Sequence, residues 1–509
     1  MKFLLALLPI LIILILMVRF RWGAARAGAA GYLSAMVISI AAFGSGPLLL
    51  AVAHGKAFLL IVDVLFIIWM AFLLFRVVDE AGAIKAIGDA LPHLTADKGM
   101  QAIIIGWVFA SFLQGVGGFG VPVAVIAPIL VGLGFAPLSA VVIPSIGHGW
   151  AVSFGSLGSS FNAMMAATNL PSDMLGPPSA LYLGIAGLGV GLMVAHIAGG
   201  WEAVRRLFLP TMIIGLAMGS AQYLAVVAGL WNIGAFIGGL TGLILGFPLA
   251  RRFRGENNET GPLDLRKLTI ALSGYAVLIT LTLGIQLIPE IRSYLSRVML
   301  TLTFPEVSTL GGYITPEGTG RKIYLFRHAG AILLYASIIA YFIYGRAGWY
   351  SPGAAGRIVS GTVTRVMSSS VGIASMVAMA IVMQHSGMTE SLARGLAEGV
   401  GVLFPLVAPV IGALGAFMTG SNTNSNVVFA ALQFRTAQML RFSVPAILAA
   451  QTSGAALGSV IAPTKVVVGA STGGMEGREG EVMRKMLVYS GLLVIMMSLV
   501  TAAVIWLSG

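Results

Sequence analysis

Charged residues and cysteine are what this 509-residue chain has least of. Only 9% of its residues are Asp, Glu, Lys or Arg, whereas soluble domains carry about 25%. So few charges cannot cover a water-facing surface, which excludes a soluble enzyme. The absence of cysteine excludes disulfides, thiolate-bound zinc, iron–sulfur clusters and cysteine catalysis. The histidines stand singly, without metal-ligand spacing, so we expect no catalytic residues, no metal site and no cofactor.

Most of the chain is apolar. Apolar residues make up 58% of the chain, the mean hydropathy is +0.96, and apolar stretches of helix length recur from end to end. This pattern is typical of an all-α polytopic membrane protein, and we expect about 12–16 membrane segments in one domain over residues 1–509. Two of these segments are expected at 179–200 and 207–228. The lipid bilayer is therefore a partner of the chain.

The excess of basic residues predicts how the segments are oriented. With 30 Lys and Arg against 18 Asp and Glu, the net charge is +12, which in a membrane protein reflects cytoplasmic cations and not a nucleic-acid partner. Most basic clusters fall on one side, which includes a cytoplasmic linker at 251–266. Both termini are then external, as is a polar connection at 290–327. The five cations of that connection conflict with the rule: Arg292, Arg297, Arg321, Lys322 and Arg327.

Two segments, 100–165 and 400–470, share an unusual layout. Each has a breaker-rich turn, GVGGFGVP in the first and SNTNSNVV in the second, followed by a second small-residue motif. Gly115 and Gly155 lie 40 residues apart, and Gly420 and Gly458 lie 38 apart. Because the charge argument starts the first segment inside and the second outside, we expect two inverted repeats, each with a broken-helix or helical-hairpin motif. The alternative is a chance similarity of small residues.

Broken helices near the middle of a membrane favour an anion site. Their half-helix N-termini carry partial positive charge, and their freed backbone groups need partners. No Asp or Glu occurs between Asp97 and Asp173, or between Glu398 and Glu476, yet Arg435 and Lys465 lie in the second of these gaps. An anionic substrate is therefore expected, although membrane segments are generally poor in acids.

Three stretches make the chain resemble a known family. They are GHGWAVSFGSLGSSF from Gly147 to Phe161, TGSNTNSN from Thr419 to Asn426, and the run from Gln451 through Lys465 to Lys485. Together they resemble the L-lactate permease family of prokaryotes. The resemblance implies proton-coupled import of L-lactate and of related 2-hydroxymonocarboxylates such as glycolate, with H⁺ as the coupling ion. It also implies kinship with the ion-transporter superfamily, a location in the plasma (inner) membrane, an elevator-like movement and a possible homo-oligomer.

Polar and glycine residues of the two segments are the substrate-binding candidates. The polar groups offer hydrogen bonds, and the glycines let a backbone approach a ligand, although several of them could only satisfy freed backbone groups or bridge helices. The candidates in the first segment are Gln114, Gly115, Gly117, Gly118, His148, Ser153, Ser156 and Ser159. Those in the second segment are Asn422, Thr423, Asn424, Asn426, Gln451, Ser459, Lys465 and Arg435.

Two of the ionisable residues are candidates for proton coupling. The histidine at 148 has an unperturbed pKa near 6.5, which suits a proton carrier, or it could be a structural residue bonded to a broken helix. Asp63 is the lone acid of its span and either carries the proton or pairs with a buried cation. Lys465 and Arg435 could each compensate a substrate carboxylate or reach the membrane interface.

Two other functions remain open on sequence grounds. A sodium-coupled organic anion transporter could use carbonyl oxygens of the Asn-rich turn, and an uncoupled anion channel could use the same half-helix dipoles. A membrane-embedded enzyme is disfavoured, because the expected helices hold no pair of carboxylates and no H-E-x-x-H motif.

Overall fold

The computed structural model describes residues 2–20, 22–90, 95, 97–117, 120–253 and 264–508. Gly118 and most of the expected linker at 251–266 lie outside these residues. Within them, eleven helices are long and apolar enough to cross a membrane, and shorter apolar helices lie at Lys2–Met17 and Val121–Gly132. The expected all-α polytopic fold is confirmed, whereas the inverted relation of the two segments and the domain boundaries stay predictions.

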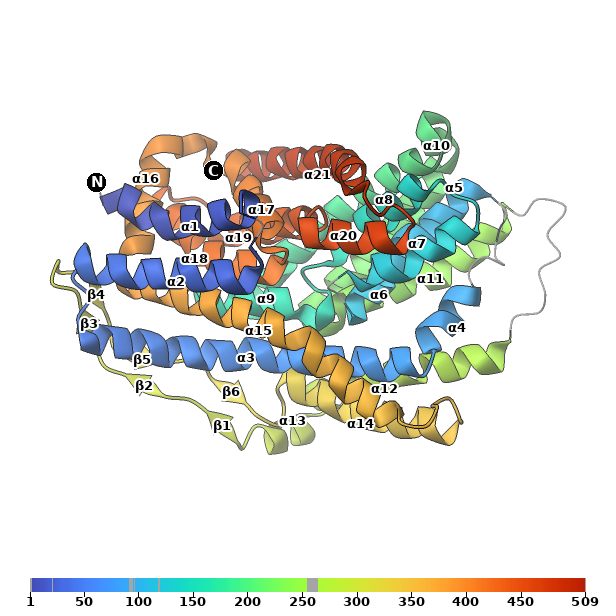
Figure 1. Ribbon diagram of the computed structural model, residues 1–509, viewed down its shortest axis with the longest axis horizontal. Coiled ribbons are helices and arrows are strands. Elements are labelled where there is room, and N and C mark those ends of the chain that lie inside the picture. Colours follow the sequence, from blue (N-terminus) through green and yellow to red (C-terminus); the bar gives the residue numbers. More distant parts are fainter. Residues whose placement is uncertain are drawn as a thin grey trace.

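Long helices form one layer, which fills the lower part of Figure 1. We call α2, α3, α12, α14 and α15 the long-helix layer; α3 packs against both α14 and α15, and α2 packs against α15. The helices from this part of the chain and its flanks are α1 (Lys2–Val18), α2 (Ala24–Ala41), α3 (Pro47–Glu80), α4 (Ala83–Ala90), α12 (Leu265–Leu287), α13 (Pro289–Leu295), α14 (Ala329–Arg346), α15 (Ala354–His385) and α16 (Met388–Val400).

The first expected repeat lies above this layer and consists of short, interrupted helices. Its elements are α5 (Lys98–Gln101), the π-helix η2 (Ala102–Phe109), α6 (Ala110–Val116), α7 (Val121–Gly132), α8 (Pro137–Gly147), the 3₁₀ turns η3 (Gly149–Ala151) and η4 (Ser156–Gly158), and α9 (Ser159–Thr168). After it come α10 (Ser172–Val227), η5 (Trp231–Ile233) and α11 (Gly234–Arg251).

The long element α10 is a helical hairpin. Its backbone is non-helical at Gly199 and Gly200, and a Cβ on Gly219 would lie only 3.3 Å from the Cα atom of Gly184. The two halves therefore pack against each other as two helices, which agrees with the two separate segments expected at 179–200 and 207–228. Small residues permit this close approach of two helix backbones.

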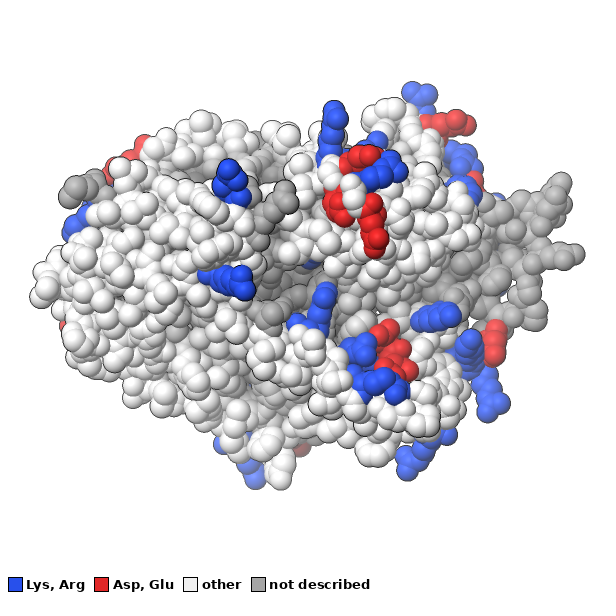
Figure 2. Space-filling view, viewed as in Figure 1, with Lys and Arg blue, Asp and Glu red and all other residues white. Residues whose placement is uncertain are grey.

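The second expected repeat repeats the pattern of interruption. It comprises η6 (Gly401–Leu403), α17 (Phe404–Thr419), α18 (Asn422–Met439), α19 (Val444–Ser459) and α20 (Pro463–Thr472), and α21 (Glu479–Ser508) ends the chain. Both termini lie in the left half of Figure 1. Figure 2 shows most of the Lys, Arg, Asp and Glu side chains of this face on the right half, while the left half is mostly uncharged.

The polar connection at 290–327 contains a β-ribbon that the sequence analysis missed. Three antiparallel pairs run along it, each strand two residues long: β1 (Met299–Leu300) with β6 (Ile323–Tyr324), β2 (Thr303–Phe304) with β5 (Gly318–Thr319), and β3 (Val307–Ser308) with β4 (Ile314–Thr315). The ribbon lies along α3, since a Cβ at Gly55 would meet the Phe304 ring at 2.7 Å. Its tip is bonded to the turn after α2 by Leu310 N–H, which donates to Gly44 O (2.9 Å).

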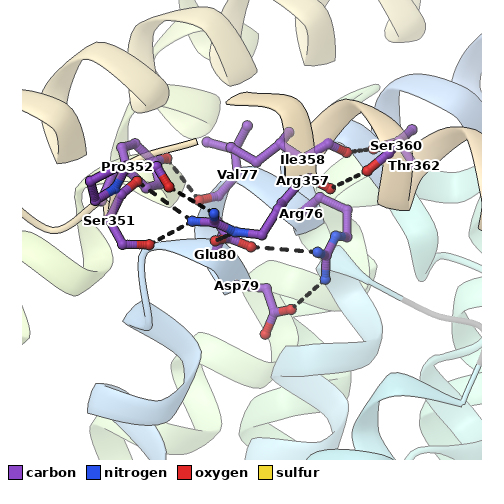
Figure 3. A network of polar contacts seen from close by, with 11 residues as sticks. Arg76, Val77, Asp79, Glu80, Ser351, Pro352, Arg357, Ile358, Ser360 and Thr362 are labelled. Atoms are coloured by element: carbon purple, nitrogen blue, oxygen red, sulfur yellow. Dashed lines mark hydrogen bonds and ion pairs between the residues drawn. The ribbon is translucent and has the colours of Figure 1, made fainter. Parts of the chain in front are cut away.

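An ion-pair network fastens α3 to α15 near the beginning of α15 (Figure 3). Arg357 Nε donates to Glu80 Oε1 (2.7 Å), and Arg76 lies 3.5 Å from the other oxygen of Glu80. Arg76 also pairs with Asp79 (3.0 Å). These contacts join two members of the long-helix layer to each other.

Candidate functional site

Glycine makes the first interruption of the first repeat possible. The helix α6 ends at Val116, and α7 begins directly after Gly120, whose φ is +87°. A Cβ at Gly115 would lie 2.6 Å from the Cα atom of Phe236, so this glycine lets α6 pack closely against α11. Gly117 faces α3 instead, because its Cβ would lie 3.1 Å from the Phe75 ring.

The second interruption, between α8 and α9, is a run of left-handed residues. Ser156, Leu157 and Gly158 have φ of 47°, 56° and 74°. A non-glycine residue in this conformation costs about 1–3 kcal/mol, so the surroundings must hold it in place. Gly158 sits against the ring of Trp231, where a Cβ would come within 2.6 Å. The run ends at the first residue of α9, which packs against α18.

The second expected repeat is also interrupted at two places. The helix α17 ends before Gly420, whose φ is +72°, and Ser421 then caps α18 by accepting a hydrogen bond from the Asn424 N–H (3.3 Å). Three residues separate the end of α19 from α20, which begins at Pro463. Proline at a helix start lacks only an N–H that would have no partner within the helix.

Two adjoining cavities lie at these interruptions. The larger, of ≈ 860 Å³, lies between the long-helix layer and the repeats, and Figure 2 shows it as a hollow near the middle of the face. The smaller, of ≈ 20 Å³, has room for a water molecule and is lined by Gln114, Val152, Ser156, Ser159, Ser160, Gly420, Ser421, Asn422, Thr423 and Lys465. Gly420, Ser421 and Lys465 line both, and we call the place where the cavities meet the central site.

The central site is electropositive. The first residues of α9 and of α18 line the smaller cavity, so two helix N-termini with partial positive charge face it. Lys465, in the first turn of α20, adds a full charge, and Arg76 and Arg365 line the larger cavity. Among the described lining residues of both cavities there is no Asp or Glu. This arrangement favours an anion.

Several buried polar atoms at or near the central site have no hydrogen-bond partner within the described part of the chain. They are Gln114 Oε1, Asn422 Oδ1, Asn424 Oδ1 and His148 Nε2. An unsatisfied buried polar atom costs about 1–3 kcal/mol. The first two belong to residues that line the smaller cavity, where a ligand with a hydroxyl group would satisfy them.

Behind these groups, polar side chains bind the two repeats together. Asn422 Nδ2 donates to Ser153 Oγ (2.9 Å), which lies 3.0 Å from Thr452 Oγ1. Asn426 Nδ2 donates to Thr452 Oγ1 (3.0 Å) and to Ser160 O (2.9 Å). Ser153 and Asn426 are thus occupied by other protein groups, and their geometry is that of positioning residues.

Three candidates of the second repeat differ in their access to the cavities. The ammonium group of Lys465 lines both cavities and donates to Ser459 Oγ (3.1 Å), which makes Ser459 its anchor. Gln451 lies deeper: its Nε2 donates to Ser425 Oγ (3.1 Å), and its Oε1 accepts from Gln433. Among the described residues that line the two cavities, Gln451 is absent.

The imidazole at 148 is fully buried and lines neither cavity. Its Nδ1 lies 2.7 Å from Pro144 O, so that Nδ1 carries a proton and Nε2 faces the interior without a partner. This is the backbone bond expected of a structural histidine, and its second ring nitrogen has no partner within the described chain.

Asp63 lies away from the central site, in a buried ionic cluster on α3. Its Oδ1 lies 2.8 Å from His328 Nε2, and its Oδ2 accepts from Arg321 Nε (3.0 Å) and from Asn162 Nδ2 (2.8 Å). Arg321 also donates to Asn162 Oδ1 (3.0 Å). We call these four residues the Asp63 cluster; it joins α3 to the connection 290–327 and to α9. Arg321 stood out in the sequence only as a cation on the unexpected side, and no sequence pattern indicated Asn162 or His328 as partners of Asp63.

Arg435 is also outside the central site. Its guanidinium donates to Gln438 Oε1 (3.2 Å) and lines a separate cavity of ≈ 320 Å³ with Lys56, Tyr313 and His385. Thr464 and Arg76, by contrast, line the larger cavity although they are not among the residues predicted from the sequence. The described residues contain no group of three or more His, Asp or Glu side chains that could hold a metal ion.

Comparison with known proteins finds related permease sequences. A sequence model described as L-lactate permease matches residues 2–508. The glycolate permease GlcA of Escherichia coli K12 is 27% identical over 94% of this chain and 91% of its own length. The L-lactate permease of Bacillus subtilis 168 is also 27% identical, over 84% and 82%, and that of Streptococcus iniae is 29% identical over 76% and 80%.

Among solved structures, the YdaH transporter of Alcanivorax borkumensis matches with a TM-score of 0.48 and 17% identity, over 87% of this chain and 85% of that one. The sequence relatives are permeases, which places the chain among transporters and not among enzymes. Because the family match extends over nearly the whole sequence, the chain belongs to the L-lactate permease family.

Proposed function

We propose that this protein imports L-lactate, and related small 2-hydroxymonocarboxylates such as glycolate, across the bacterial plasma membrane by proton symport. The observation that carries the proposal is the central site, where two helix N-termini and Lys465 meet and no carboxylate lines the wall within the described chain. The names of the relatives supply the substrate class.

The site accounts for both functional groups of such a substrate. The carboxylate docks against the N-termini of α9 and α18, with the Lys465 ammonium beside it. The 2-hydroxyl donates to the free amide oxygen of Gln114 or Asn422. Since the smaller cavity holds ≈ 20 Å³, the substrate lies where it opens into the larger one.

Proton coupling is assigned to the histidine at 148 or to Asp63. The histidine has a free ring nitrogen close in sequence to the residues of the site. Protonation of Asp63 would weaken its pairs with Arg321 and His328, and so loosen α9 from α3. An elevator-like movement of the repeats along the long-helix layer would require this contact between α3 and α9 to break. The termini are assigned to the outside, and the highly charged right-hand end of Figure 2 to the cytoplasm.

The test uses purified protein in sodium-free proteoliposomes, an inward proton gradient and a voltage clamped near zero. We expect concentrative uptake of labelled L-lactate that a protonophore abolishes, and counterflow by unlabelled lactate. Uptake that requires sodium would overturn the coupling, and uptake without counterflow would indicate a channel.

A pair of lysine variants tests the site in the same assay. Lys465→Gln should raise the KM for lactate at least about tenfold, because the substrate carboxylate loses its positively charged partner at the central site. Lys98→Gln is the matched control, since Lys98 is exposed in α5 and lines none of the described cavities. Equal effects of the two variants would remove Lys465 from the site.

A further inference from the structure

A fourth cavity lies at the Asp63 cluster, and all four residues of the cluster line it. It has a volume of ≈ 350 Å³, is formed by α3, α9, α13, α14, the ribbon and the ends of α10, and shares no lining residue with the central site. Its wall includes Ser172 and Ala228, the two ends of the α10 hairpin, so it lies opposite the bend at Gly199. Asp63 and Ile67 of its wall come from the middle of α3, so the cavity lies part-way along the helices, on the side of the bend that the topology proposed above assigns to the outside.

The wall of this cavity carries far more positive than negative charge. Arg292, Arg321, Lys322 and Arg327 line it, and Asp63 is the one carboxylate among its described lining residues. Both oxygens of Asp63 are already engaged by Arg321, His328 and Asn162. Within the described chain, the other three cations form no ion pair with a carboxylate. These are the cations that conflict with the charge rule in the sequence.

Two of these cations repel each other. Burial and the neighbouring Arg292 guanidinium hold the pKa of Arg327 below its ordinary value. Arg327 Nε is buried and has no hydrogen-bond partner in the described chain, although its guanidinium lies 4.3 Å from the centre of the Tyr324 ring. An anion between the two arginines would relieve the repulsion and accept the free N–H.

Another residue of the same wall offers an acceptor for a hydroxyl. Asn232 also lines the cavity, is 4% exposed, and its Oδ1 has no partner within the described residues. A small molecule with a carboxylate and a neighbouring hydroxyl would therefore find both cations and a buried acceptor in the wall of one cavity. This repeats, with different residues, the chemistry of the central site.

We infer that this cavity is a second substrate site, which captures a small 2-hydroxymonocarboxylate from the external solution before it reaches the central site. The inference rests on the proposed function. Arg292, Lys322 and Arg327 attract and hold the carboxylate, and Asn232 accepts from the hydroxyl. Paired cations of this kind raise the local concentration of an anion and the rate of its association, in a manner that salt screens.

The test measures lactate uptake from the outside by intact cells that express the protein. The double variant Arg292→Gln/Arg327→Gln should raise the external KM about five- to tenfold at low ionic strength, with little change in the maximal rate. Added salt should raise the KM of the wild type toward that of the variant. Counterflow started from the inside should keep its wild-type KM, because the central site is intact.

Two further variants separate this site from general surface charge and from misfolding. Arg297→Gln is the matched control: it removes one cation from the same connection, but Arg297 stacks over the Tyr294 ring at 4.8 Å and lines none of the described cavities. Arg292→Lys/Arg327→Lys keeps both positive charges, so its external KM and its salt dependence should stay close to those of the wild type. A double Gln variant with wild-type KM and salt dependence, or an equal loss in Arg297→Gln, would overturn the inference.

An anionic lipid headgroup could occupy the same cations, so direct binding distinguishes the two ligands. In nanodiscs of neutral lipid, the wild type should bind two labelled L-lactate molecules per chain, and the double Gln variant one. If the wild type and the variant each bind one lactate molecule per chain, the cavity is not a second substrate site, and its cations hold a lipid headgroup or no ligand. A wild type that binds and transports no lactate at all would instead defeat the proposed function.

Discussion

Helix α3 carries two ionic clusters that differ in what they join. Near its C-terminal end, Arg76, Asp79 and Glu80 meet Arg357 of α15 (Figure 3), where the side chains of Glu80 and Arg357 are 15% and 45% exposed. In its middle, the Asp63 side chain is 3% exposed and bonds to the connection and to α9. The first cluster binds the long-helix layer to itself, whereas the second crosses from that layer to a repeat. Only a crossing contact must break if the repeats move.

The largest effect is expected from Asp63→Asn, which leaves Arg321 and His328 facing a neutral group. Removing one partner of a buried ion pair costs on the order of 3 kcal/mol. We expect lower thermal stability, and loss of proton-driven lactate accumulation while lactate exchange continues. Asp63→Asn/Arg321→Gln should regain stability without regaining accumulation. Full accumulation by Asp63→Asn would exclude Asp63 from coupling.

Replacing His148 sharpens the comparison, because His148 is the coupling candidate with no ion pair in the described chain. His148→Ala should retain lactate exchange and lose accumulation driven by a pH gradient, since the free Nε2 that could take the proton is gone. Proteoliposomes with and without a gradient measure both. Loss of binding itself would make His148 a substrate ligand instead.

Asn162→Ala breaks the crossing contact while the ion pairs of Asp63 remain. Two hydrogen bonds to charged groups are lost, each worth about 1.5–3 kcal/mol. Because the natural chain has no cysteine, a single Ser360→Cys in the larger cavity can report its accessibility to a thiol reagent. Labelling should slow several-fold when Asn162 is also replaced, as the repeats leave this conformation more often. An unchanged labelling rate would mean that the Asn162 contact does not stabilise this conformation.

The smallest effect is expected from Glu80→Gln at the other cluster. Partly exposed pairs contribute about 0–1 kcal/mol and are screened by salt. The melting temperature should fall by a few degrees at low salt and recover at high salt, with lactate uptake within about twofold of the wild type. A loss of transport as large as that of Asp63→Asn would remove the distinction between the clusters.

The sequence predicted the features that depend on local chemistry. Hydropathy indicated the membrane helices, and glycines marked the interruptions between α6 and α7 and at Gly420, because a glycine acts on the backbone where it stands. The expectation that the asparagine-rich run is part of the second turn was wrong: from Asn422 on it forms the first turns of α18, where Ser421 caps the helix. Asp63 was expected either to carry the proton or to pair with a buried cation; the pairing is present, and the coupling role stays a prediction.

Features that depend on distant contacts could not be predicted. The partners of Asp63 lie 99, 258 and 265 residues away in the sequence, and no local sequence pattern indicates them. Lys465 and Arg435 looked alike in the sequence, yet one lines the central site and the other a separate cavity. The ribbon was missed because each of its strands is only two residues long, and its polar sequence was interpreted as a loop.

The tip of that ribbon offers a natural place to divide the chain. Gly311 and Gly312 are exposed there, whereas the neighbouring ribbon is docked by Leu310 on the turn after α2 and by Phe304 on α3. A cut between the two glycines would leave one expected repeat on each fragment, with the strand pairs and the Asp63 cluster holding the fragments together. The two halves, made as separate polypeptides in one cell, would thus be expected to reassemble, so that assembly of the repeats could be studied apart from their synthesis.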